Sequence, residues 1–465
     1  MIIYQLFPRV YGATPNKRCG TFSDISDDEI ERIKSLSISH IWLTGVIRHS
    51  GWRDTNPAVT KGNAGSPYAI VDYYDVDPDL ADNEVKRMEE FEYTIKRIHN
   101  QGLKVIIDFV PNHLAREYRG DFTDENFYIL QGQRFYGPND NGFMYYEDPA
   151  KATGNDVFSP TPSVNDWYDT VKLNYTNHDT WHKMLKIMQF WCEKGVDGFR
   201  CDMAEMVPVE FWQWAIAGLR KLFNVIMIAE IYQPHLYQSY VEAGFDYLYD
   251  KVGLYNTLEN IYRYGQRADT ITDVWKNLNG LDDNMLRFME NHDEVRLASR
   301  CFMQQPENAF PFVALSALMN RGPFMIYNGQ EYGENASDSD NGKTSIFDYT
   351  YMPSMIRRGE SSFARIYDWY QQLLRFRESH PAILQGAFYD LMWANPWYNN
   401  FDPQYVYAFL RYHDDDKLLI VINFNLNEGR NVTVTIPEDA RQLVGGCNEK
   451  YEIEMSPGDV KIIEI

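Results

Sequence analysis

Residues 196–203 read VDGFRCDM, an apolar run that closes on two charged side chains, Arg200 and Asp202. The run does not alternate between apolar and polar residues, which indicates a strand buried on both faces of a parallel sheet. Because side chains two residues apart on a strand point the same way, Arg200 and Asp202 should lie side by side. The stretch therefore predicts a parallel sheet with ionisable groups at the carboxyl end of a strand.

Seven further runs along the chain have the same continuous apolar character. They are IIYQLF (2–7), HIWLTGV (40–46), LKVIIDFV (103–110), VIMIAEI (225–231), FDYLYD (245–250), MLRFMEN (285–291) and PFMIYN (323–328). The segments between them have helical periodicity; Ser26 begins one helix in a capping box, and Gly102 and Gly195 end two others. Eight strands separated by helices, with no G-x-G-x-x-G turn, favour an α/β closed (βα)8 TIM barrel over an open sheet.

Two regions interrupt this alternation. Residues 113–170 are rich in Tyr, Asn, Asp, Gly and Pro and form too long a stretch for an ordinary βα loop. From residue 386 the pattern is antiparallel, with YVYAFLRY, KLLIVINFNL, RNVTVTIP and DVKIIEI separated by turn residues. We therefore predict a catalytic barrel of residues 1–112 and 171–385, an inserted B domain after strand 3 at 113–170, and a C-terminal β-sandwich domain at 386–465.

Composition narrows the classes of partner. The chain has 465 residues and a net charge of −22 without a basic run, so nucleic acid is not an expected partner, whereas a neutral, hydroxyl-rich ligand is compatible with this charge. No stretch of about 18 apolar residues predicts a membrane span. The five cysteines are scattered and odd in number, which indicates free thiols. With no secretion signal at the start, we expect a cytoplasmic protein; the sequence leaves its oligomeric state open.

Acids and histidines gather at the carboxyl ends of four expected strands, where barrel enzymes hold their active sites. They are Asp108 and His113, Asp202, Glu230, and His292 and Asp293. Each alone could be a cap or an ion-pair partner, but their shared rim favours catalysis. Retaining glycoside cleavage uses two carboxyl groups roughly 5 Å apart, one ionised and one protonated. Arg200 would keep Asp202 ionised, while Glu230, with no basic neighbour on its strand, would hold the proton.

These segments resemble the motifs of the α-amylase family, glycoside hydrolase family 13. The matching segments are 108–113 (D-x-x-x-N-H), 198–202 (G-x-R-x-D), Glu230, 291–293 (N-H-D), the early loop 68–78, and 322–331 at the eighth strand. Their order and their places on the strands match as well. The resemblance covers the barrel, the inserted domain and the C-terminal β domain, and so spans residues 1–465.

The resemblance implies a role for each residue. Asp202 is the nucleophile that forms a covalent glycosyl-enzyme, Glu230 is the acid/base, and Asp293 stabilises the transition state. The residues implied to bind substrate are Tyr68, His113, Arg200 and His292. The implied reaction is retaining hydrolysis of α-glucosidic bonds in α-glucans or maltooligosaccharides, with no cofactor required for the chemistry.

Two departures from the family pattern keep alternatives open. Many amylases read D-x-x-K-H after the nucleophile, whereas this chain has Glu205 and Met206, so an α-glucan transglycosylase or a glucosyl isomerase remains an alternative to a hydrolase. Asn112 is the candidate ligand of a structural calcium ion, with the carbonyl of Met206 and with Asp156 or Asp166. Lys172 replaces the carboxylate of the family's D-L-N segment, which leaves calcium binding open.

Two other classes of function are a binding or scaffold protein and a metal-dependent barrel enzyme. A barrel that only binds or scaffolds usually lacks one of the three acids, and all three are present here. A metal-dependent lyase or hydrolase would need histidine ligands, but His40, His49, His113 and His292 form neither H-x-H nor H-E-x-x-H spacing. The sequence therefore favours a glycosidase over both.

Overall fold

The computed structural model describes residues 1–53, 55–138, 142–397 and 400–465. Eight parallel strands close into a barrel in the order β1-β16-β15-β14-β13-β12-β5-β2, as the eight apolar runs predicted. Their bounds are β1 (Ile2–Leu6), β2 (His40–Leu43), β5 (Lys104–Phe109), β12 (Gly198–Cys201), β13 (Ile226–Ala229), β14 (Tyr247–Tyr249), β15 (Met285–Phe288) and β16 (Phe324–Tyr327). Because every pair is parallel, all eight carboxyl ends lie on one rim.

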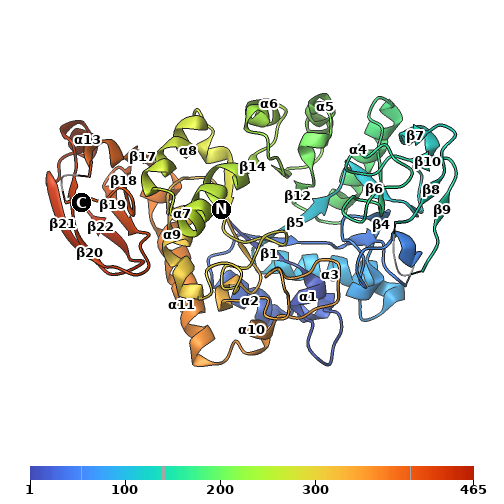
Figure 1. The fold of residues 1–465 in the computed structure, drawn as a ribbon, viewed down its shortest axis with the longest axis horizontal. Coiled ribbons are helices and arrows are strands. Elements are labelled where there is room, and N and C mark those ends of the chain that lie inside the picture. The colour runs from blue at the N-terminus through green and yellow to red at the C-terminus, as the bar shows by residue number, and fades with distance from the viewer. Residues whose placement is uncertain (54, 139–141, 398–399) are drawn as a thin grey trace.

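Helices surround this barrel (Figure 1). They are α1 (Pro8–Tyr11), α2 (Asp27–Lys34), α3 (Arg87–Asn100), α4 (His178–Glu193), α5 (Val209–Leu219), α6 (Tyr237–Glu242), α7 (Asn256–Tyr264), α8 (Ile271–Asn277), α9 (Phe310–Leu318), α10 (Pro353–Ile356) and α11 (Ser361–Ser379). Two short helices, α12 (Pro381–Leu384) and α13 (Glu438–Leu443), lie with the C-terminal strands. Ser26 caps α2, as expected, by accepting a hydrogen bond from the amide of Glu29. None of the helices in the described ranges is long and apolar enough to cross a membrane.

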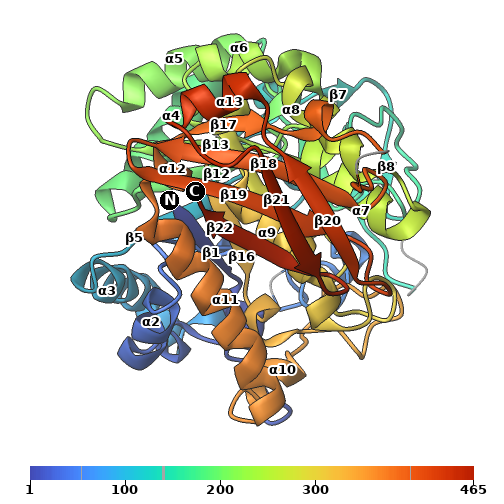
Figure 2. The ribbon, with the colours of Figure 1, turned by 90° about the vertical axis from the view of Figure 1, so that its left-hand side faces the viewer.

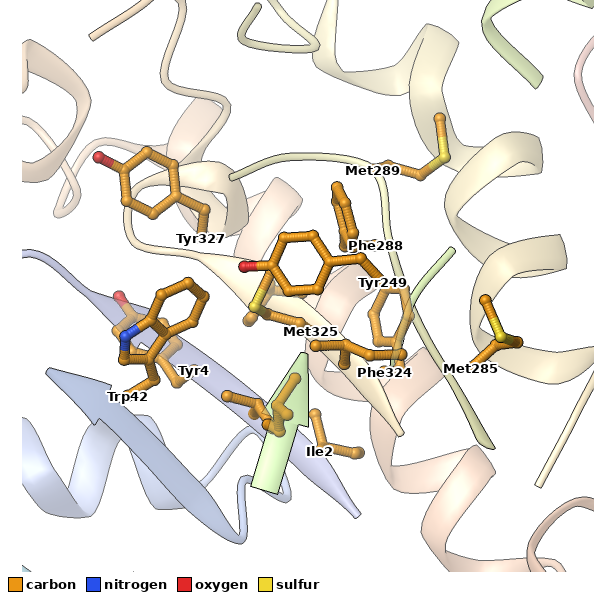
Figure 3. Close-up of a cluster of buried hydrophobic side chains, with 14 of the residues drawn as sticks. Ile2, Tyr4, Trp42, Tyr249, Met285, Phe288, Met289, Phe324, Met325 and Tyr327 are labelled. Carbon is orange, nitrogen blue, oxygen red and sulfur yellow. The ribbon is translucent and has the colours of Figure 1, made fainter. Parts of the chain in front are cut away.

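The strands are buried on both faces, which explains why their sequences do not alternate. Every residue of β1, β12, β15 and β16 is buried. Figure 3 shows one cluster of the resulting core, in which Ile2 and Tyr4 of β1 lie near Trp42, Phe324 and Tyr249. This packed interior fixes the strands, and through them the side chains at the rim.

Short strand pairs occupy the long segment after β5. They are β6 (His113–Ala115), β7 (Ile129–Leu130), β8 (Phe135–Tyr136), β9 (Tyr146–Glu147), β10 (Ala150–Lys151) and β11 (Thr170–Lys172). β6 pairs with β11, which closes the segment on itself next to the barrel rim. A further hairpin of β3 (Ile47–His49) and β4 (Ile70–Val76) carries the early loop. The exact domain limits at 113, 171 and 386 stay predictions.

The C-terminal part is an antiparallel β structure, as expected. One sheet contains β17 (Ala387–Asp390), β18 (Val406–His413), β19 (Asp416–Asn423) and β22 (Val460–Glu464), and the other pairs β20 (Arg430–Thr435) with β21 (Lys450–Met455). Figure 2 views these strands in front of the barrel, and Figure 1 places them at the opposite end of the molecule from β7–β10. Two of these strands, β17 and β21, were not predicted from the sequence. β21 has exposed glutamates between its buried residues, which weakened its apolar signal.

A buried ion pair joins two neighbouring barrel strands, and its loss should measurably lower the free energy of unfolding. Arg287 of β15 lies 3.1 Å from a carboxylate oxygen of Asp250, which follows β14, and both side chains are inaccessible to solvent. Asp250→Asn keeps an oxygen for the amide of Leu254. It leaves the guanidinium of Arg287 with the more distant carboxylate of Asp282, 3.8 Å from Nη2. We expect it to lower the free energy of unfolding by about 3–5 kcal/mol in urea denaturation.

Two variants control this prediction. Asp250→Asn with Arg287→Met removes both charges and should recover part of the loss. Asp269→Asn removes a partner of the exposed Arg267 and should change stability little. Equal effects of Asp250→Asn and Asp269→Asn would contradict the importance of the buried pair.

Candidate active site

Asp202 and Glu230 leave neighbouring strands at the same height. The amide of Asp202 bonds the carbonyl of Phe109 on β5, and the amide of Glu230 bonds the carbonyl of Cys201 on β12. Met203 then turns the chain with a left-handed φ of 42°, a conformation that is costly for a residue with a side chain. This turn directs the amide of Met203 to Glu230 Oε2 at 2.8 Å, so the backbone after one carboxylate holds the other.

A single guanidinium connects the acids of the rim. Arg200 is fully buried, with Nη1 2.8 Å from Asp202 Oδ1 and 3.5 Å from Asp108 Oδ1. Its Nη2 lies 2.8 Å from Glu230 Oε1. Arg200 lies beside Asp202, as strand alternation predicted, and Glu230 also approaches it from the adjacent strand. Two carboxylates held by one guanidinium are close together, as retaining cleavage requires.

The charges at this rim do not balance. Burial first, and then the neighbouring Glu230 carboxylate, raise the pKa of Asp202 well above its usual value, although Arg200 opposes the shift. Burial likewise raises the pKa of Asp108. Contrary to the sequence expectation, the adjacent Arg200 does not keep the pKa of Asp202 low, because burial and the Glu230 carboxylate together outweigh the guanidinium.

One oxygen of Asp202 is left available. Oδ1 accepts from Arg200, whereas Oδ2 is buried and has no hydrogen-bond partner within the described part of the chain. Nε2 of His113 lies 4.0 Å from Oδ2 and would form an ion pair with it only if the ring were protonated. Burial, with a further contribution from Lys172, lowers the pKa of His113 to about 3, so its ring is neutral. An unpaired carboxylate oxygen beside a neutral imidazole suits attack on an uncharged sugar.

Asp293 is ionised by its neighbours. Burial opposes its charge, but His292 and Arg200 outweigh burial and lower the pKa of Asp293 to about 2. The side-chain amide of Gln5 lies 2.7 Å from Nδ1 of His292 and can donate to it, which leaves Nε2 to face Asp293 Oδ2 at 3.0 Å. The Tyr68 ring stacks on His292 at 5.3 Å between ring centroids, and its hydroxyl contacts Nε2.

A cavity of about 270 Å3 brings the expected residues together. Tyr68, His113, Asp202, Glu230 and Asp293 all line it, while Arg200 and His292 lie immediately behind these groups. The lining residues that were not predicted are Lys61, Ser66, Trp167, Asp169, Thr170, Met203, Tyr232, Ile346 and Phe347. A second hollow of about 470 Å3, formed by residues 334–353, shares Asp293, Ile346 and Phe347 with it.

Tyr232 is the missed residue that the sequence could have revealed, because it lies two positions beyond Glu230. Its hydroxyl donates to Glu230 Oε1 at 2.6 Å, and its ring lines the cavity. Glu205 holds this residue in place: Glu205 Oε2 accepts the backbone amides of Tyr232 at 2.9 Å and of Gln233 at 3.1 Å. The carboxylate at position 205 therefore serves the protein's own backbone and does not line the cavity.

The expected calcium ligands surround a lysine. Asn112 Oδ1 lies 2.5 Å from Lys172 Nζ, and Asp156 and the carbonyl of Met206 also contact that ammonium group. Asp166 instead bonds Ser163 and Asn155. Within the described ranges, no group of three or more His, Cys, Asp or Glu residues could hold a metal ion. A calcium ion does not fit this oxygen cluster while the ammonium group remains in it.

The catalytic domain can be compared with known proteins. The model of the family described as "Alpha amylase, catalytic domain" matches residues 5–351. The chain belongs to the α-amylase family. It is 24% identical to alpha-amylase 3 of Dictyoglomus thermophilum over all of this chain and 93% of that protein. It is 22% identical to an alpha-1,4-glucan:maltose-1-phosphate maltosyltransferase of Picrophilus torridus, over 93% of this chain and 62% of that protein.

The fold agrees with this membership. A noncanonic maltogenic alpha-amylase of Thermotoga neapolitana superimposes with a TM-score of 0.72 at 24% identity, covering 99% of this chain and 97% of that one. The protein is thus a glycosidase of the α-amylase family. Because relatives of this family are named for hydrolysis and for glycosyl transfer, membership alone does not determine which of the two this chain performs.

The raised pKa of Asp202 predicts that its negative charge destabilises the folded protein. Folding raises this pKa from its usual 3.8, so the wild type loses stability as the pH rises from about 4 through the folded-state value. Asp202→Asn removes that loss. We expect its Tm to exceed that of the wild type most at high pH and to match it near pH 4, as measured by thermal unfolding across pH.

Asp197→Asn, at the residue that directly precedes β12, is the matched control. Burial opposes the charge of Asp197, but hydrogen bonds from Lys104, Val105 and His99 lower its pKa. The sign therefore reverses, and Asp197→Asn should be less stable than the wild type above its usual pKa. A Tm of Asp202→Asn below that of the wild type at every pH would refute the assignment of a charge penalty to Asp202.

Proposed function

We propose that this protein is a retaining glycosidase that cleaves α-glucosidic bonds in α-glucans or maltooligosaccharides. The observation that carries the proposal is the unpaired Oδ2 of Asp202 beside Glu230, with both carboxyl groups held by Arg200. This combination offers a nucleophilic oxygen and a proton donor on one buried guanidinium. The aromatic residues of the cavity lining, Tyr68, Trp167 and Phe347, support a ligand with flat apolar faces such as a sugar ring.

The proposed reaction has two steps. Asp202 Oδ2 bonds the anomeric carbon while the glycosidic C–O bond breaks and Glu230 gives its proton to the departing oxygen. Water then attacks the anomeric carbon from the vacated side; Glu230 takes a proton from it, and Asp202 leaves as a carboxylate. Asp293, ionised by His292, is placed to hold sugar hydroxyls and to favour the positive charge that develops on the ring.

Transfer to a sugar acceptor is the second candidate, with the same first step. It differs only in that an acceptor hydroxyl replaces water in the second step. Tyr232 favours it, because an aromatic ring hydrogen-bonded to Glu230 lies where a departing or incoming sugar would stack. An isomerase would be the special case in which the departing sugar returns through another hydroxyl.

We also propose that the protein works in a reducing compartment such as the cytoplasm. All five cysteines are free thiols, and burial raises the pKa of Cys19 and of Cys192 to about 12, so these two are protonated and unreactive.

Cleavage assays test the leading proposal directly. With maltoheptaose, pullulan, isomaltose, sucrose and trehalose offered separately, we expect at least one α-linked substrate to be cleaved and its new reducing end to appear first as the α anomer by NMR. Asp202→Asn should lower kcat at least about a thousandfold, because it removes the attacking oxygen. Product as the β anomer, or equal rates for Asp202→Asn and wild type, would refute the retaining mechanism.

Tyr232 variants distinguish stacking from hydrogen bonding on the leaving-group side. Tyr232→Ala should raise KM for an oligosaccharide about threefold to tenfold, since stacking on one ring contributes about 0.5–1.5 kcal/mol. Tyr232→Phe keeps the ring and should leave KM near the wild-type value while lowering kcat. Tyr264→Ala, at an exposed ring outside the cavity, serves as the control.

Product analysis with an added acceptor completes this test. A larger oligosaccharide that appears in wild type and declines in Tyr232→Ala would favour transfer. Free reducing sugar as the sole product at every acceptor concentration would exclude it. An unchanged KM in Tyr232→Ala would show that Tyr232 does not contact the leaving sugar.

A further inference from the structure

Lys172 brings an ammonium group into a site made of oxygen atoms from three separate segments. It lies at the end of β11, and its side chain is 9% exposed. Nζ contacts Asn112 Oδ1 at 2.5 Å, Asp156 Oδ1 at 3.2 Å and Oδ2 at 3.4 Å, and the carbonyl of Met206 at 3.3 Å. Asn112 follows β5, Asp156 belongs to the long segment after β5, and Met206 follows the turn that carries the nucleophile.

The partners of Lys172 are themselves fixed. Asn112 is fully buried, and its Nδ2 donates to the carbonyl of Gly154 at 2.8 Å, which leaves Oδ1 directed at the ammonium group. Asp156 has a left-handed φ of 63°, so the backbone is bent to bring its carboxylate to this place. Met206 ends the short helical turn Ala204–Met206 that begins one residue after Met203.

The oxygen cluster suits one monovalent charge. Calcium takes six to eight oxygens, several of them carboxylates, at about 2.3–2.6 Å. Here the carboxylate that contacts the ammonium group is that of Asp156, and Lys172 already supplies the compensating positive charge. A divalent cation among the same oxygens would lie against that ammonium group and be repelled by it.

The position of Lys172 connects it to the active site. Asn112 directly precedes His113, whose ring lines the catalytic cavity. The strand of Lys172 pairs with that of His113, with Lys172 opposite His113 in register. Met206 lies four residues after Asp202. An ammonium group bound to all three segments therefore restrains both the imidazole and the turn that carries the nucleophile.

We infer that the Lys172 ammonium is a built-in cation that joins the 113–170 segment to the barrel in place of a structural metal ion. Lys172 is a positioning residue for His113 and for the Asp202 turn, and the folded enzyme is independent of divalent cations. The inference does not depend on which glycoside the enzyme cleaves, because its first readout is thermal stability.

The experiment compares Tm with calcium and with EDTA for four proteins. The wild type should unfold at the same temperature in both. Lys172→Met, which leaves Asp156 and Asn112 Oδ1 without a cation, should lose several degrees in both. Lys172→Asp creates a second carboxylate beside Asp156, so it should be less stable than wild type in EDTA and regain Tm with calcium. Lys151→Met removes a lysine that contacts Asp124 and Glu147, and is the matched control.

Kinetic measurements distinguish a role of Lys172 in positioning the active site from a role in stability alone. We expect Lys172→Asp to have a lower kcat than wild type in EDTA and to recover it with calcium, while Lys151→Met keeps the wild-type kcat. A wild-type Tm that rises with calcium or falls in EDTA would overturn the inference. So would a Lys172→Met protein as stable as Lys151→Met, or a Lys172→Asp protein as stable as wild type in EDTA.

Discussion

The active site depends on one buried positive charge, the Arg200 guanidinium. It contacts Asp202, Asp108 and Glu230, and its remaining surface faces the rings of Trp42, Tyr68 and Tyr249. Three acids with one guanidinium leave the rim short of positive charge, and burial prevents water from compensating. Burial therefore raises the pKa of Asp202 and of Asp108, although Arg200 opposes both shifts.

A second buried cation performs a mechanical task at the same rim. Lys172 donates to the oxygens of Asn112, Asp156 and Met206, which belong to three separate segments of the chain. The two cations thus have different roles. Arg200 acts on the charge of the reacting groups, whereas Lys172 restrains the backbone around them. Glu205 makes a comparable contribution on the opposite side, where it binds the turn that carries Tyr232.

Much of the fold was readable in the sequence, because a barrel strand buried on both faces has few polar residues. All eight predicted runs form barrel strands, whereas β17 and β21 were not predicted because exposed residues interrupt their apolar pattern. Strand alternation also predicted that Arg200 lies beside Asp202. Trp167, Lys61 and Phe347 could not be found, because they reach the cavity from irregular loops without periodicity.

The sequence by itself determined the barrel, the rim and the acids on it, since these follow from local periodicity and from the shared direction of parallel strands. Only the tertiary structure decided how those acids are charged. Arg200 binds Glu230 as well as Asp202, and Lys172 lies among the oxygens expected to hold calcium. Electrostatic energies depend on distance and burial between segments far apart in the chain, and the order of residues specifies neither.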